Sequence, residues 1–149
     1  MISAHHAGYV VDASVLVKWF LYQQEADRDR ALALMELHIL GRSTIHIPQL
    51  ALMEVLNAIR FAPKAKEEDG KLALEALWDL HLETKPPEPN LLRKANAIAW
   101  AYKVTISDSL YVALAEQVGY PLITADEKMI EKLTGHSIVV PLKELEFRG

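Results

Sequence analysis

Short apolar runs alternate along the chain with longer segments in which apolar residues recur every three or four positions. The short runs predict buried strands and the longer segments predict amphipathic helices, because side chains alternate along a strand and repeat every 3.6 residues around a helix. The predicted strands are 9–11, 45–47, 104–106, 122–124 and 138–140. The predicted helices are 14–21, 25–40, 49–61, 67–80, 90–102, 107–118 and 126–133. This alternation predicts a three-layer α/β/α fold, with helices on both faces of a central, mainly parallel sheet of four to five strands.

Two segments are expected to lie outside these elements. The run 85–89 contains three prolines, and it predicts an extended linker because proline cannot continue a helix and restricts the residue before it. Asn90 is expected to cap the helix that follows. Residues 1–8 form a polar lead-in that is expected to be flexible. His5 and His6 within it are expected to be solvated rather than to bind a metal, because they have no further ligand nearby in the sequence.

Length and composition narrow the classes of protein to consider. A chain of 149 residues is expected to form a single domain, 1–149, that buries about 70 % of its unfolded surface. No apolar run approaches the roughly 20 residues of a membrane span, and no secretory leader is evident, so a cytoplasmic location is expected. The absence of cysteine excludes disulfides, thiolate metal sites and a cysteine nucleophile. The net charge of −4 predicts no broad basic surface for nucleic acid.

Four carboxylates occupy similar places in the predicted fold. Asp12 follows the first strand, Asp108 follows 104–106, and Asp126 follows 122–124. Glu54 lies in the first turns of the helix after the second strand. In open α/β sheets ligands bind beyond the carboxyl ends of the strands. The four side chains are therefore expected to share one edge of the sheet.

A purely structural explanation competes with a site. Aspartate is a favoured helix N-cap, and Asp12, Asp108 and Asp126 each stand at a junction before a helix. Glu54 has no such role, and burying an unpaired carboxylate costs several kcal/mol. Its partner is expected to be either a basic residue, Lys18 or Arg60, or a bound cation.

A divalent metal ion is the cation that suits this set of ligands. Clustered carboxylates raise one another's pKa unless a cation keeps them ionised. Oxygen ligands without cysteine favour Mg²⁺ or Mn²⁺ over zinc, and such an ion activates water and binds phosphate oxygens. This chemistry predicts phosphodiester hydrolysis. Ser14 and Thr124 are expected either to orient an aspartate or water, or simply to bond at a strand end, and Asn57 either holds Glu54 or faces a loop.

Four motifs in this order resemble the PIN-domain family, and most closely its VapC-like toxins. The motifs are Val11–Phe20 (VDASVLVKWF), Pro48 with 54–58 (EVLNA), 107–115 (SDSLYVALA) and 122–126 (LITAD). The likeness extends from Tyr9 to about Leu142. Two departures from many relatives are Ser107, where an aromatic residue is common, and Ser109, where alanine is common, and neither removes a ligand.

The resemblance implies a PIN-like α/β/α domain with Mg²⁺- or Mn²⁺-dependent endoribonuclease activity. It implies that the family's acidic quartet corresponds to Asp12, Glu54, Asp108 and Asp126 as catalytic and metal-binding residues, with Ser14 and Thr124 in support. It also implies an RNA substrate, a homodimer and, for a toxin, a cognate antitoxin that blocks the site. Weaker candidates for RNA contact are the scattered basic residues Lys18, Arg60, Lys64 and Lys66.

Two other readings of the chain compete with the nuclease. One is another metal-dependent phosphohydrolase of α/β fold, such as a haloacid-dehalogenase-like phosphatase, but that chemistry wants an aspartate where Ser14 stands. A signal-receiver domain is a related possibility that lacks its acidic pair here. The other reading is a catalytically silent PIN-like interaction module, in which the carboxylates only cap helices.

Overall fold

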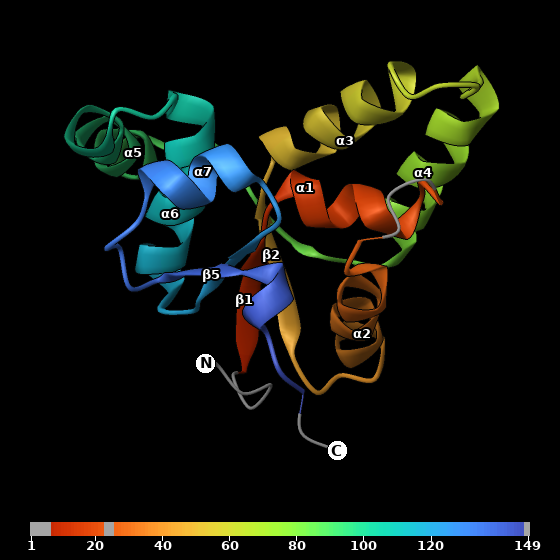
Figure 1. The fold of residues 1–149 in the computed structure, drawn as a ribbon, viewed down its shortest axis with the longest axis horizontal. Coiled ribbons are helices and arrows are strands. Elements are labelled where there is room, and N and C mark those ends of the chain that lie inside the picture. Colours follow the sequence, from red (N-terminus) through yellow and green to blue (C-terminus); the bar gives the residue numbers. More distant parts are fainter. Residues whose placement is uncertain (1–6, 23–25, 148–149) are drawn as a thin grey trace.

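A computed structural model describes residues 7–22 and 26–147 as a three-layer α/β/α domain around one five-stranded sheet (Figure 1). His5 and His6 lie outside the described residues, as does Glu25 at the start of one predicted helix. The strands are β1 (Gly8–Val11), β2 (Thr44–Pro48), β3 (Glu83–Lys85), β4 (Leu122–Thr124) and β5 (Val139–Pro141). Their order is β3-β2-β1-β4-β5, and every neighbouring pair is parallel. The predicted fold class is confirmed.

Helices cover the two faces of the sheet. The helices are α1 (Ala13–Leu16), α2 (Arg28–Ile39), α3 (Leu50–Arg60), α4 (Glu67–Asp79), α5 (Pro89–Tyr102), α6 (Ile106–Val118) and α7 (Glu127–Lys132), with 3₁₀ turns at Val17–Trp19 and Leu142–Glu144. In Figure 1, α1 to α4 lie on one side of the sheet and α5 and α6 lie on the other. Among the described residues, no helix combines the length and apolar character needed to cross a bilayer.

The centre of the core lies where β1 meets α6. All four residues of β1 are buried, as expected for a central strand of a parallel sheet with helices on both faces. In α6, seven consecutive residues from Ser109 to Ala115 are buried. A helix buried on every side is apolar all round, which explains why 109–115 lacks the amphipathic pattern of a surface helix.

The predicted strand 104–106 is wrong. Lys103 adopts a left-handed conformation (φ 57°) that ends α5, and α6 begins at Ile106 after its N-cap Thr105. The Thr105 hydroxyl accepts a hydrogen bond from the Asp108 backbone N–H at 3.0 Å. This threonine cap, not a strand, organises the junction, so α5 and α6 pack as a helical hairpin.

The remaining strand of the sheet comes from a polar segment instead. β3 pairs with β2 in the register His46↔Glu83 and Pro48↔Lys85, and its first two residues are exposed at the sheet edge.

Two smaller differences concern helix ends. Asn90 is not a cap, because α5 already begins at Pro89 with Glu88 as its N-cap. The predicted helix 14–21 is a single α-turn that continues as a 3₁₀ turn.

Candidate metal centre

Asp12 stands at the carboxyl end of β1 and is only 5 % exposed. Its Oδ2 accepts two hydrogen bonds, from Ser14 Oγ at 2.5 Å and from Thr124 Oγ1 at 3.0 Å. Those hydroxyls are themselves held by backbone donors: Ser14 Oγ accepts from Ala125 N, and Thr124 Oγ1 accepts from Asp126 N. Within the described part of the chain, Oδ1 has no hydrogen-bond donor, and no buried side-chain polar atom is left without one. Oδ1 therefore keeps some contact with solvent and has no donor among the described residues.

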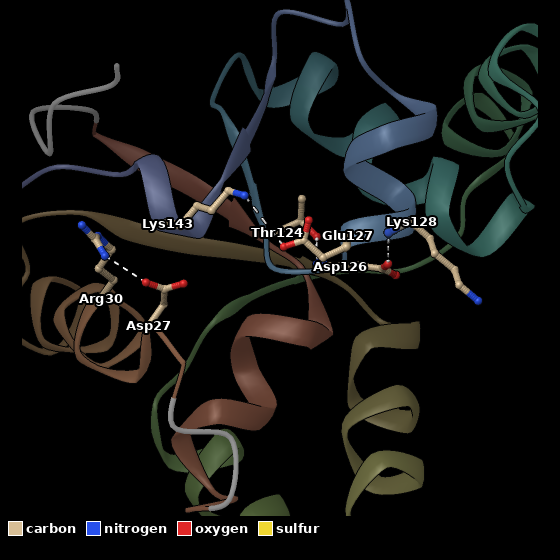
Figure 2. A network of polar contacts seen from close by, with 7 residues as sticks. All are labelled: Asp27, Arg30, Thr124, Asp126, Glu127, Lys128 and Lys143. Atoms are coloured by element: carbon tan, nitrogen blue, oxygen red, sulfur yellow. Dashed lines mark hydrogen bonds and ion pairs between the residues drawn. The ribbon is translucent and has the colours of Figure 1, made fainter.

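Asp126 follows β4 by one intervening residue and is the N-cap of α7. Its Oδ1 accepts from the backbone N–H groups of Lys128 at 3.0 Å and Met129 at 3.2 Å. Figure 2 shows Asp126 between Thr124 and the start of α7. The capping role considered for Asp126 is thus confirmed. Because both cap bonds end on Oδ1, the second carboxylate oxygen is not used by the cap.

Asp108 lies in the first turn of α6, after a threonine cap rather than after a strand. Its side chain is half-buried, and the cap of this helix is Thr105. Asp12 likewise occupies an N-cap position without making a side-chain cap bond. The capping explanation is therefore wrong for Asp12 and Asp108.

Glu54 reaches the same region from the middle of α3 and is half-buried. Its Oε1 accepts a hydrogen bond from the Tyr111 hydroxyl at 2.5 Å. Among the described ion pairs none involves Glu54, so neither Lys18 nor Arg60 neutralises it. Asn57 is exposed and donates no hydrogen bond to Glu54 within the described residues. The partner of Glu54 is a neutral tyrosine, which the sequence analysis did not identify.

The electrostatics join the four carboxylates into one site. Burial raises the pKa of Asp12 and of Asp108, and it raises the pKa of Glu54 from its ordinary 4.5 to about 7. The neighbouring negative charges add to each shift: Asp126 and Asp108 act on Asp12, and Asp12, Asp108 and Asp126 act on Glu54. Burial also raises the pKa of Tyr111, so its hydroxyl stays protonated and donates. The Lys132 ammonium opposes the shift at Asp108, but within residues 7–22 and 26–147 no ion pair joins a cation to any of the four carboxylates.

The chemistry of these donors suits a hard divalent cation, although they do not form a closed cage. Over residues 7–22 and 26–147 no three Asp, Glu or His side chains come close enough together to hold a metal ion by themselves. Mg²⁺ commonly binds through one or two carboxylates and keeps several waters. An oxygen-only donor set of this kind, in which the pKa values of Asp12, Glu54 and Asp108 are raised, fits such an ion.

The four basic residues named from the sequence are placed differently from one another. Lys18 is only 6 % exposed, which leaves little of it for RNA. Arg60, Lys64 and Lys66 are exposed where α3 ends and α4 begins. The Arg60 guanidinium lies 5.3 Å from the centre of the exposed Phe61 ring.

The fold and the site together define an α/β/α domain with a parallel central sheet and acidic side chains at the carboxyl ends of β1 and β4. The model of the PIN domain matches residues 9–134, and the chain belongs to the PIN-domain family. It is 33 % identical over 129 residues to Ribonuclease VapC3 of Pyrobaculum aerophilum, covering 83 % of this chain and 92 % of that protein. It is 34 % identical over 94 residues to Ribonuclease VapC1 of Mycobacterium tuberculosis, covering 61 % and 69 %. It shares the fold of VapBC2 from Rickettsia felis, solved bound to a promoter DNA fragment (TM-score 0.66, 16 % identity, 94 % and 98 % coverage).

Thr124→Val tests whether the hydroxyl of Thr124 maintains this arrangement. Valine keeps the shape of the buried side chain but removes a donor to Asp12 Oδ2 and an acceptor for Asp126 N. We expect the free energy of unfolding to fall by about 1–3 kcal/mol, because a buried polar group loses its partner. Urea denaturation at neutral pH measures this loss. Thr84→Val, at an exposed position of β3, is the control, and equal stability of the two variants would contradict the role of Thr124.

Proposed function

We propose that this chain is a divalent-metal-dependent endoribonuclease that hydrolyses phosphodiester bonds of RNA. The observation that carries the proposal is a set of four carboxylates whose negative charges act on one another and that no described ion pair joins to a cation: Asp12, Glu54, Asp108 and Asp126. Relatives from the same family that carry the name ribonuclease support this chemistry. Mg²⁺ or Mn²⁺ is the proposed cofactor, because both prefer carboxylate and water oxygens.

The proposed roles follow from which oxygen atoms are free. When bound, the metal supplies Lewis-acid activation of water and neutralises charge on the phosphate. Asp12 contributes Oδ1, while Ser14 and Thr124 hold Oδ2 and thereby fix the plane of the carboxylate. Asp126 contributes the oxygen that its helix cap does not use. Asp108 adds a third carboxylate beside it.

Glu54 has a separate role in this proposal. Its Oε1 is held by Tyr111, so Oε2 is the oxygen that faces a metal ion or an attacking water. A carboxylate with a pKa of about 7 is well matched to accept a proton from water near neutral pH. We therefore assign Glu54 either to ligation or to general-base action, and both require the same oxygen.

The biological setting we propose is a toxin–antitoxin pair. The chain shares its fold with a toxin–antitoxin complex from Klebsiella pneumoniae (TM-score 0.68) and with the VapBC2 complex. We propose a cognate antitoxin as partner, a homodimer as the assembly and the cytoplasm as the location. RNA contact is assigned to Arg60, Lys64 and Lys66, whose charges are exposed at one end of α3, rather than to the buried Lys18.

Removal of the metal tests the proposed reaction. We expect purified protein to cleave an end-labelled single-stranded RNA in the presence of Mg²⁺ or Mn²⁺. Excess EDTA should stop cleavage, and excess Mn²⁺ should restore it. The carboxylates alone provide no Lewis acid to activate water and to stabilise charge on the phosphate oxygens. Gel electrophoresis of the products measures the rate. Cleavage that continues unchanged in EDTA, or no cleavage with either metal, would contradict the proposal and favour a silent interaction module.

A further inference from the structure

Tyr111 stands out because its hydroxyl is the polar end of a side chain buried inside an apolar helix. The residue is 0 % exposed and lies within the run of buried residues in α6. It is located three residues after Asp108, so both side chains leave neighbouring turns of the same side of α6. A buried tyrosine hydroxyl needs a hydrogen-bond partner, and here the partners belong to the candidate metal centre.

The Tyr111 hydroxyl connects two other elements of the site. It donates to Glu54 Oε1 at 2.5 Å and accepts from the Ala13 backbone N–H at 3.3 Å. Ala13 directly follows Asp12, so a single hydroxyl links α3 to the junction of β1 and α1. Through its own helix it is also tied to Asp108. Three of the four carboxylates therefore depend on elements that meet at this oxygen atom.

The chemical nature of the donor suits this position. A lysine or arginine beside Glu54 would cancel its charge and compete with a cation. A phenol instead gives a directional hydrogen bond and leaves the net negative charge in place. It also donates to Oε1 alone, which leaves Oε2 without a donor among the described residues. Outer-shell hydrogen bonds of this kind orient ligands and tune metal sites.

We propose that Tyr111 is a positioning residue that holds Glu54 in the orientation required for metal binding and RNA cleavage. This inference rests on the proposed function, since it assigns Tyr111 a role within the same site. In a purely structural role, the hydrogen bond would only pair a buried hydroxyl group. Removal of the Tyr111 hydroxyl would then lower the stability of the fold and leave metal binding unchanged.

Tyr111→Phe tests the proposal because it removes one oxygen atom and keeps the ring in the core. We expect the affinity for Mn²⁺, measured by calorimetry on the metal-free protein, to fall roughly 10–100-fold, as for other outer-shell ligands. The turnover number for RNA cleavage at saturating RNA should fall with it. A crystal structure of metal-free Tyr111→Phe should show the Glu54 carboxylate rotated away from its position, with α6 unmoved.

Val112→Ala is the matched control, because Val112 is also 0 % exposed on α6 and its side chain cannot hydrogen-bond. It should lower the melting temperature while leaving the Mn²⁺ affinity unchanged. Wild-type affinity and an unmoved Glu54 in Tyr111→Phe would overturn the inference while leaving the proposed function intact. An equal loss of Mn²⁺ affinity in Val112→Ala would also overturn it, in favour of a structural role. Failure of the wild-type protein to bind Mn²⁺ or cleave RNA would instead overturn the proposed function.

Discussion

Asp12→Asn is expected to abolish metal-dependent RNA cleavage, with a loss on the order of a thousandfold in turnover, while the protein remains folded. A metal ion contributes several kcal/mol to transition-state stabilisation, and each 1.36 kcal/mol corresponds to about a tenfold change in rate. Asparagine has the same shape as aspartate but lacks its charge. Its amide also places an N–H₂ group where one carboxylate oxygen stood. Either the hydroxyls of Ser14 and Thr124 or the cation then meets a donor instead of an acceptor.

The fold should tolerate this change because the charge of Asp12 does not stabilise the metal-free protein. Burial raises the pKa of Asp12, and the nearby Asp126 and Asp108 raise it further. A neutral side chain of equal volume removes that cost, so the melting temperature without metal should be equal or higher. Cleavage of end-labelled RNA and thermal melting by circular dichroism measure the two effects.

Asp79→Asn, purified in the same way, is the matched control, because Asp79 is exposed at the end of α4. It should cleave RNA as the wild type does, which also rules out a contaminating nuclease as the source of activity. Unfolding of Asp12→Asn would favour a structural role for the carboxylate. Full cleavage by this variant would contradict the assignment of Asp12 to the metal centre.

The regular part of the fold could be predicted because its signals are local. Buried parallel strands appear as continuous apolar runs, and this is why β1, β4 and β5 are predicted near their observed positions, while β2 is predicted from its alternating Ile-His-Ile pattern. β3 was missed because its residues are Glu-Thr-Lys, and it is a strand only through pairing with β2 at the sheet edge. The opposite error occurs at 104–106, which is predicted as a strand but is not one. Its β-branched residues favour a strand, whereas the cap formed by Thr105 starts a helix.

The candidate site shows the same division between local and long-range information. The charges of Asp12, Glu54, Asp108 and Asp126 act on one another, although Asp108 comes from the first turn of α6 and not from the end of the predicted strand 104–106. The sequence does not predict the hydrogen bond between Tyr111 and Glu54, because these residues lie 57 positions apart in the chain. A usable signal was present, however: it is a tyrosine within an otherwise apolar run of α6.

The proposed second role of Asp126, as a metal ligand, is compatible with its role as a helix cap. A carboxylate has two oxygens and about four lone-pair sites, and the cap of α7 occupies only Oδ1. Asp12 divides its oxygens in the same way, with both hydroxyl donors on Oδ2. Glu54 repeats the pattern with Tyr111 on Oε1. In each case the protein fixes one oxygen and leaves the other, which is how a rigid site for a cation can be built from flexible side chains.

Glu54→Gln is expected to stabilise the metal-free protein at pH 8 while reducing RNA cleavage by roughly a hundredfold or more, as befits loss of a general base or a ligand. The pKa of Glu54 is raised to about 7, so the folded state binds a proton more tightly than the unfolded state does. Stability then falls as pH rises from about 4.5 to 7, because in that range the folded protein holds more protons. Asp12 and Asp108, with raised pKa values, act in the same direction.

The size of this effect at Glu54 is limited by its partial exposure. The full shift would correspond to about 3 kcal/mol, and solvent screening reduces this to about 1–2 kcal/mol. Urea denaturation of metal-free wild type between pH 5 and pH 8 should therefore show decreasing stability, with a flatter profile for Glu54→Gln. Added Mn²⁺ should restore the stability of the wild type at pH 8 by mass action and have less effect on Glu54→Gln. Glu131→Gln, at an exposed position of α7, should follow the wild type. A wild-type profile that rises between pH 5 and pH 8 without metal would show that the charge on Glu54 is already compensated within the protein.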